Sequence, residues 1–400
     1  MDSEHLLQLI KNNEIRHINL KNQQIEEDQL IAIINALQVN TSVQQINIIC
    51  KNVDKNFALA MANVIMVNTF IQEINLYDNE IGDEGRAKKS SEGVKHIASA
   101  LMSNTSIRVI RWVCNQFGDE GARHIGNALM SNTSLQSINL WNNQIGPEGA
   151  KHIASALRFN RNTSLRSIDL ACNQIGDEGA KHIASALMSN TSVQEINLNG
   201  NKIGPEGAKH IASALRSNRN ISVQAINLYG NEIGDEGAKH IANALMSNTF
   251  IQELYLGYNE IGDKGAKHIA RALRFNRNTS VHVIDLWCNK IGDEGAKHIG
   301  NALVSNTSLQ TIILEGNHID REGKKAISEA VENNPFVKRK LDRAQSALIV
   351  YIFESRYQRF LDPALWNHHI NKNKKKMSVR IIKDIMQAIL LRKTNKTLIF

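Results

Sequence analysis

The sequence predicts an α/β solenoid: similar strand–helix units stacked into a horseshoe, with a parallel β-sheet on the concave face and helices on the convex face. Three observations lead to this prediction. The string SLQSINLWNNQIGPEGAKHIASAL at Ser134 returns as SLRSIDLACNQIGDEGAKHIASAL at Ser164. Each copy joins a short alternating apolar segment to a segment with helical periodicity. The copies recur every 28 or 30 residues, a length typical of one unit of a repeat protein.

An asparagine after each strand segment serves as the anchor of a unit. Gln23 and Lys51 take its place in two degenerate units, which gives about 11 units. We therefore predict a repeat domain over residues 1–334 and a basic helical C-terminal extension over 335–400. The clear anchors are Asn79, Asn115, Asn143, Asn173, Asn201, Asn231, Asn259, Asn289 and Asn317.

Within a unit, the strand precedes the helix. Ile138 and Leu140 alternate with Asn139 and Trp141, which predicts a short strand with one buried side. Apolar residues then follow at helical spacing over residues 150–157. The pattern therefore predicts one strand and one helix in every unit.

Helix starts are marked by an alternation of two residue types. Asp177, Asp235 and Asp293 suit the positive end of a helix, and Pro147 and Pro205 replace aspartate at the same place. Because proline is tolerated only in a first turn, the replacement fixes where the helices begin.

Neighbouring units must bury one another's apolar faces, since one unit cannot bury its own. Strands stack about 4.8 Å apart, whereas packed helices need roughly 8–10 Å. We therefore expect the stack to curve with its strands inside. The N-terminal segment HLLQLIKNN predicts a helix that caps one end of the stack.

The strand motif LxxN and the helix motif GAKHIASAL resemble the leucine-rich repeat, in particular its ribonuclease-inhibitor-like subfamily, which also occurs in NOD-like receptors. The resemblance covers about residues 1–334 and implies a non-enzymatic horseshoe that binds proteins. Ribonuclease inhibition is a weaker alternative, because the cysteine-rich, strongly acidic character of that inhibitor is missing here.

Sequence motifs give no support for an enzyme, a cofactor or a small-molecule substrate. The chain contains no phosphate-binding glycine loop, no nucleophile elbow and no Cys-x-x-Cys pair. Eight histidines share one repeat position. The helices that carry them lie roughly 8–10 Å apart, so their nitrogens cannot all approach one zinc ion to the required ~2 Å. These histidines are His96, His124, His152, His182, His210, His240, His268 and His298.

The sequence features that bear on localisation predict a cytoplasmic protein. The N-terminus carries acids and lacks an apolar core, so we expect no secretory signal. Four cysteines are too few for a disulfide-built secreted scaffold. The tripeptide NTS, repeated in the connecting loops, formally matches a glycosylation acceptor, but we expect it to recur only because the loop recurs.

Units that otherwise agree differ on the inner face of the predicted sheet. Side chains six, four and two residues before each anchor point to the concave side. Acids at these positions, Glu73, Glu195 and Glu315 among them, face only one base, Arg111. Such residues could simply keep the face soluble, but aromatic rings on a polar surface are typical interface anchors. We predict a surface for a basic or mixed-charge protein partner, formed by Tyr77, Trp141, Asp169, Asn197, Tyr229, Glu253, Tyr255, Tyr258, Asp285 and Trp287.

Two basic regions provide alternatives. Arginines at the ends of every second helix could cap those helices or form a secondary binding edge. Residues 336–400 hold 15 Lys and Arg against 4 Asp and Glu, so the net charge of +8 belongs to the tail. The tail could cap the solenoid, or bind nucleic acid or an anionic membrane. The arginines of the edge are Arg158, Arg161, Arg216, Arg219, Arg274 and Arg277.

Overall fold

The computed structural model divides the chain into two compact units, Met1–Phe353 and Glu354–Phe400. It describes residues 3–21, 25–49, 55–79, 91–159, 164–217, 222–275, 280–334 and, for the backbone alone, 349–351. All of these belong to the first unit, and the predicted helices beyond residue 353 lie outside the described residues.

Helices and strands alternate along the first unit, as the sequence predicts. The helices are α1 (Ser3–Lys11), α2 (Glu27–Ala36), α3 (Lys55–Val67), α4 (Glu92–Leu101), α5 (Gly118–Ser131), α6 (Pro147–Phe159), α7 (Gly176–Leu187), α8 (Pro205–Arg216), α9 (Gly234–Leu245), α10 (Asp263–Arg274), α11 (Asp293–Leu303) and α12 (Arg321–Asn333). The strands are β1 (His17–Lys21), β2 (Gln45–Ile49), β3 (Glu73–Leu76), β4 (Val109–Arg111), β5 (Ser137–Asn139), β6 (Ser167–Asp169), β7 (Glu195–Asn197), β8 (Ala225–Asn227), β9 (Glu253–Tyr255), β10 (Val283–Asp285), β11 (Thr311–Ile313) and β12 (Ile349–Tyr351).

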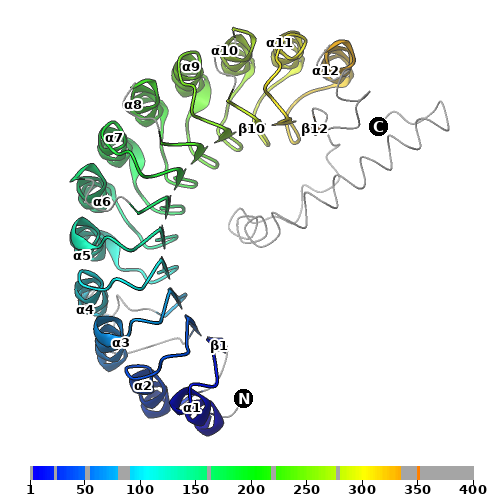
Figure 1. Cartoon of the computed structure of the whole chain (residues 1–400). Helices are drawn as coiled ribbons and strands as arrows, with labels where there is room; N and C mark the ends of the chain where they lie inside the picture. Colours follow the sequence, from blue (N-terminus) through cyan, green and yellow to red (C-terminus); the bar gives the residue numbers. More distant parts are fainter. Residues whose placement is uncertain are drawn as a thin grey trace, which may run out of the picture. The chain divides into compact units, whose positions relative to one another are not determined.

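The strands form one parallel sheet whose spatial order follows the sequence order. Equivalent residues pair from repeat to repeat, so that Ile138 lies beside Ile168 and Ile168 beside Ile196. Within residues 1–353 the strands line the inner side of an arc and the helices its outer side (Figure 1). The predicted α/β solenoid is confirmed.

Each unit buries the same set of apolar side chains between its strand and its helix. In the repeat that begins with β5, Leu135, Ile138, Leu140, Ile153 and Leu157 are all at most 3% exposed. The strand residues between them, such as Ser137 and Asn139, are only half-buried and face the other side. The alternation read from the sequence therefore separates a continuous core from a concave surface.

Two ladders of buried asparagines tie neighbouring repeats together. In the first ladder, the anchor Asn201 donates its side-chain amide to the carbonyl of Leu170 (3.0 Å), and its backbone N–H donates to Asn231 (3.0 Å). In the second, Asn132, the first residue of an NTS tripeptide, donates to the carbonyl of Leu101 (2.7 Å) and is 1% exposed. The repeated tripeptide thus has a structural role, and at this position the side chain is inaccessible for glycosylation.

The predicted aspartates lie in the first turns of their helices, and they also cap the helix of the following repeat, which the sequence did not reveal. Asp177 Oδ1 on α7 accepts hydrogen bonds from the N–H groups of Gly204 (2.6 Å) and Gly207 (2.9 Å) at the start of α8. Asp119, Asp235, Asp263 and Asp293 make equivalent bonds to the helices that follow them. Unpaired N–H groups at a helix start are thus satisfied across the repeat boundary.

Repeats that begin with proline solve the same problem differently. Pro147 and Pro205 provide no carboxylate for the next helix. There Gly176 and Gly234 take φ values of +60° and +59°, which glycine adopts without strain. Each donates its N–H to the carbonyl of the next anchor, Asn201 in the case of Gly176 (2.9 Å).

Residues 349–351 correct another expectation. The sequence predicted a helical extension over residues 335–400, but Ile349–Tyr351 form β12, parallel to β11. The open edge of β11 offers unpaired backbone groups, and a run of β-branched and aromatic residues suits a strand.

Candidate protein-binding surface

The concave face consists of the side chains six, four and two residues before each anchor, on and directly after the strands. The predicted partner-binding residues lie along this face, except Tyr258, which is one residue before its anchor and 56% exposed. Tyr77 and Trp141 follow β3 and β5, whereas Tyr229, Tyr255 and Trp287 gather at β8–β10. The structure therefore groups only the second set into one cluster.

The position four before the anchor has a structural role that the sequence reading missed. Asn139 Oδ1 accepts a hydrogen bond from the backbone N–H of Trp141 (2.9 Å). Asp285 Oδ1 does the same for Trp287 (2.8 Å). Asparagine and aspartate recur here because their short side chains can bond the backbone two residues later. The recurrence of a short polar residue before a turn was the available signal.

Asp169 is held by its neighbours on both sides. It accepts a hydrogen bond from the Asn139 amide (3.2 Å), bonds the Asn197 side chain, and receives the N–H of Ala171 (2.9 Å). Burial raises the pKa of the Asp169 carboxyl to about 6 despite these bonds. Its side chain is thus largely occupied within the face.

Three aromatic rings stack at the carboxyl ends of β8–β10. Tyr229 lies 5.8 Å from Trp287 and 6.2 Å from Tyr258 between ring centroids, with interplanar angles of 18° and 24°. Gly257, between Tyr229 and Trp287 in the row, leaves room for the ring of Tyr229, since a Cβ there would lie 2.7 Å from it. Tyr229 is consequently only 6% exposed. The expectation that Tyr229 is an exposed ring is wrong, and its neighbours form the accessible surface.

Tyr255 and Glu253 form a pair beside this stack. The Tyr255 hydroxyl donates to Glu253 Oε2 (2.6 Å). Burial and the neighbouring carboxylate raise the pKa of Tyr255, which keeps the hydroxyl protonated as a donor.

Charge is distributed unevenly along the concave face. Near its N-terminal end, Arg111 on β4 pairs with Glu73 on β3 and neutralises it. Among the described residues, no ion pair joins Glu195, Glu253, Asp285 or Glu315 to a base. The C-terminal part of the face is therefore an aromatic surface with uncompensated acids.

The basic edge is described only in part. Arg158, Arg216 and Arg274 lie in the last turns of α6, α8 and α10 and are exposed, a position favoured for a cation. Phe159 and Phe275 beside two of them are 65% and 59% exposed, which the sequence reading missed. The other three arginines, Arg161, Arg219 and Arg277, lie outside the described residues.

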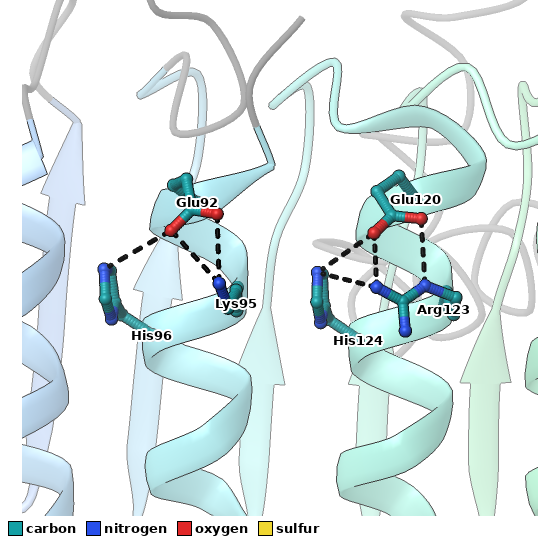
Figure 2. Close-up of polar contacts among 6 residues, drawn as sticks. All are labelled: Glu92, Lys95, His96, Glu120, Arg123 and His124. Atoms are coloured by element: carbon teal, nitrogen blue, oxygen red, sulfur yellow. Dashed lines mark hydrogen bonds and ion pairs between the residues drawn. The ribbon is translucent and has the colours of Figure 1, made fainter.

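The convex face repeats one arrangement from helix to helix. On α4, Glu92 pairs with Lys95 (3.1 Å) and lies 3.9 Å from His96 (Figure 2). On α5, Glu120 pairs with Arg123 and lies 3.4 Å from His124. In the part of the chain that the structure describes, no three ligand-type side chains are placed to hold a metal ion. None of the described helices is both long enough and apolar enough to span a bilayer.

Comparison with known proteins identifies the repeats. The family model "Leucine Rich repeat" matches residues 67–88, 131–154, 161–184, 189–212, 219–242, 247–270, 277–300 and 305–328. No curated protein matches the sequence.

Among solved structures, three illustrate the similarity, although none superimposes closely. The second actin-binding site of leiomodin-1 is 22% identical, covers 42% of this chain and 93% of its own, and has a TM-score of 0.34. An internalin from Listeria monocytogenes is 17% identical, covers 82% and 92%, and has a TM-score of 0.44. The protein LegL7 from Legionella pneumophila is also 17% identical, covers 79% and 96%, and has a TM-score of 0.44.

The matched segments coincide with the stacked strand–helix units described above. Eight sequence matches and the parallel solenoid lead to the same conclusion: the chain is a leucine-rich repeat protein.

Proposed function

We propose that the protein is a non-enzymatic scaffold that binds a protein partner on the concave face. One observation carries the proposal: the concave side chains differ between repeats whose cores are nearly identical, and at β8–β10 they bring together stacked rings and acids. Aromatic groups that combine a large apolar area with a polar tip are typical of interface centres.

The partner surface is basic or of mixed charge. Uncompensated acids on β7, β9, β10 and after β11 would accelerate encounter with positive groups and disfavour acidic partners. Trp141, Tyr255 and Trp287 supply the contact area, and Tyr229 supports Trp287 and Tyr258 from beneath.

The test begins with a pull-down from cell extract using the full chain, followed by affinity measurements on the partner identified. Replacing Trp141, Tyr255 or Trp287 by alanine should weaken binding by about 1–4 kcal/mol each. The quadruple variant, in which Trp141, Tyr229, Tyr255 and Trp287 are all replaced by alanine, should no longer bind the partner. The matched control replaces four convex lysines, Lys151, Lys181, Lys209 and Lys239, by alanine. Unchanged affinity of a folded quadruple concave variant would place the site elsewhere.

A second candidate function rests on the charge of the tail. Residues 336–400 carry a net charge of +11, enough to attract nucleic acid or an anionic membrane. Heparin and liposome binding should be compared for the full chain and residues 1–353, a fragment that keeps β12 paired with β11. Retained binding by the fragment would point to the arginine edge or to the basic residues of 336–353 that the fragment keeps.

We also propose that the chain belongs to the ribonuclease-inhibitor-like subfamily of leucine-rich repeat proteins. Its support is the regular α-helix that each well-defined repeat carries after its strand. Inhibition of ribonucleases is the weaker alternative, and a ribonuclease assay with the purified chain tests it directly.

A further inference from the structure

Asp169 and Asp285 occupy the same position in repeats that differ around them. Each follows the same strand pattern, and each bonds the backbone N–H two residues later. In the sheet, Asp169 lies between Asn139 and Asn197, and both amides bond it. The remaining oxygen of Asp169 is therefore satisfied by the protein itself.

Asp285 has no such neighbours. The sheet register places it between Tyr255 on β9 and Ile313 on β11. Its side chain is 8% exposed, and its one hydrogen bond among the described residues comes from the N–H of Trp287. A buried carboxylate without a cation or a second donor is costly, unless a bound group supplies the missing partner.

The surroundings of Asp285 suit a positive charge. Tyr255 lies beside Asp285 on the neighbouring strand β9, and Trp287 follows Asp285 by two residues in the sequence. Glu253 and Glu315 occupy the diagonal positions, which strand spacing places roughly 8 Å away. The half-buried Glu315 has no ion pair among the described residues.

An unused hydroxyl lies in the same cluster. Tyr229 is 6% exposed, and its hydroxyl oxygen has no hydrogen-bond partner among the described residues. Its ring stacks on Trp287, which lies two residues after Asp285. Burial raises the pKa of Tyr229, and the neighbouring Cys288 and Asp285 add to this effect. In this cluster the Tyr229 hydroxyl thus lacks a partner among the described residues, and Asp285 has one hydrogen-bond donor where Asp169 has three.

We propose that Asp285, Tyr255 and Trp287 form a site for one arginine side chain of a basic partner segment. The guanidinium would donate to Asp285 and stack on the ring of Trp287 or Tyr255, while Glu253 and Glu315 add attraction from the sides. This inference rests on the proposed function, since it specifies what the concave face recognises in its partner.

Arginine fits this site better than lysine for a geometric reason. A guanidinium is flat and weakly hydrated, and it can stack on a ring while its edge donates to a carboxylate. An ammonium group is strongly hydrated and would lose more solvation in a site where Asp285 is nearly buried.

The test uses the full chain and fluorescently labelled oligo-arginine, oligo-lysine and oligo-citrulline peptides of equal length, with binding followed by fluorescence polarisation. Citrulline keeps the shape of arginine without its charge. Asp285→Asn keeps the acceptor for the Trp287 N–H but removes the charge. Asp169→Asn is the matched control, because it makes the same change at the same repeat position. Trp287→Leu tests the ring, and thermal unfolding checks that each variant is folded.

We expect oligo-arginine to bind more tightly than oligo-lysine, and oligo-citrulline not to bind. Asp285→Asn should weaken oligo-arginine binding about tenfold or more, as expected for a lost charge-assisted bond, and Asp169→Asn less than about twofold. Equal losses in the two aspartate variants, or no loss in Asp285→Asn, would overturn the site. Equal affinity for oligo-lysine would overturn the choice of arginine.

The outcome separates this inference from the proposed function. If the protein partner needs the concave face but Asp285→Asn leaves oligo-arginine binding intact, only the arginine site fails. If Asp285→Asn abolishes peptide binding while the quadruple concave variant still binds the protein partner, the arginine site stands and the proposed function fails.

Discussion

The convex and concave faces of this solenoid are made by the same repeats but follow opposite rules. On the convex face, helices α4–α9 and α11 each present a glutamate, a base three residues later and a histidine after the base. On the concave face, the rows six and two residues before the anchor change from repeat to repeat, and aromatic rings gather at β8–β10 beside Glu253 and Asp285. Uniformity marks the surface that keeps the stack soluble, and variation marks the surface that can select a partner.

The two faces also differ in how far their charged groups are buried. The convex charges are exposed and close to water, where ion pairs contribute little. The concave acids at Asp169 and Asp285 are buried enough to shift their pKa, and Tyr229 is buried beneath its neighbours. Substitutions on the concave face should therefore change the stability more than substitutions on the convex face.

Tyr229→Ala should lower the free energy of unfolding by about 2–4 kcal/mol, because it leaves a cavity beneath Trp287 and Tyr258. Tyr229→Phe should cause no loss, since it keeps the ring and removes a hydroxyl that no described residue bonds. Urea denaturation of both variants measures the difference. If Tyr229→Phe destabilised the protein as much as Tyr229→Ala, the hydroxyl would have a partner and the ring would matter less than we infer.

The buried aspartates should make stability depend on pH. Burial raises the pKa of Asp169 and Asp285 from an ordinary 3.8 to about 6. The folded chain therefore binds more protons than the unfolded chain in this window, and the stability contribution present below pH 4 is lost as the pH rises through about 6. Replacing either residue by asparagine should reduce the loss by roughly 1–3 kcal/mol. Thermal unfolding of wild type and variants at pH 4 and 7 tests this, and parallel pH profiles would contradict it.

Asp177→Ala should lower the free energy of unfolding by about 1–2 kcal/mol, because it removes the acceptor for two N–H groups of α8. Hydrogen exchange should accelerate at Gly204 and Gly207, in the following repeat. Asp177→Asn, which keeps an acceptor oxygen, is the matched control and should lose less. Faster exchange confined to α7 would show that the aspartate serves its own helix.

The smallest effect is expected on the convex face. Glu178→Gln breaks exposed contacts with Lys181 (3.0 Å) and His182 (3.8 Å). We expect no resolvable change in Tm at physiological salt, since exposed pairs are screened and flexible. A clear destabilisation would mean that the convex stripe is a cooperative network and would weaken the contrast between the faces.

The sequence predicted the features that depend on periodicity. The nine asparagine anchors, the strand with one buried side and the helix start all follow from spacing within one unit, and the structure confirms them. The degenerate anchors Gln23 and Lys51 lie outside the described residues. Features that depend on contacts between units were missed. The cap from Asp177 reaches the next helix, and Tyr229 is buried because Gly257, one repeat away, has no side chain. The glycine between Tyr229 and Trp287, in the row two residues before the anchor, was the available signal.

Two further features were not predicted because they also depend on contacts between repeats. The run that contains Ile349–Tyr351 pairs with β11 because that strand has a free edge, which local pattern does not reveal. The distinction between Asp169 and Asp285 also requires the register, since both look alike within their own repeats. The proposed partner-binding residues remain a prediction until a partner is measured.

The glycine before each helix has a consequence for how such a chain can change its length. Behind an aspartate repeat, Gly204 and Gly292 are not left-handed, with φ values of −92° and −99°, whereas behind a proline repeat Gly234 takes +59°. Because glycine adopts either conformation, a repeat can follow either kind of predecessor with its first turn still hydrogen-bonded. Aspartate repeats already follow one another at α9, α10 and α11. Gain or loss of a single repeat in the gene would thus leave every helix start satisfied, and the concave face could be lengthened or shortened to suit a new partner.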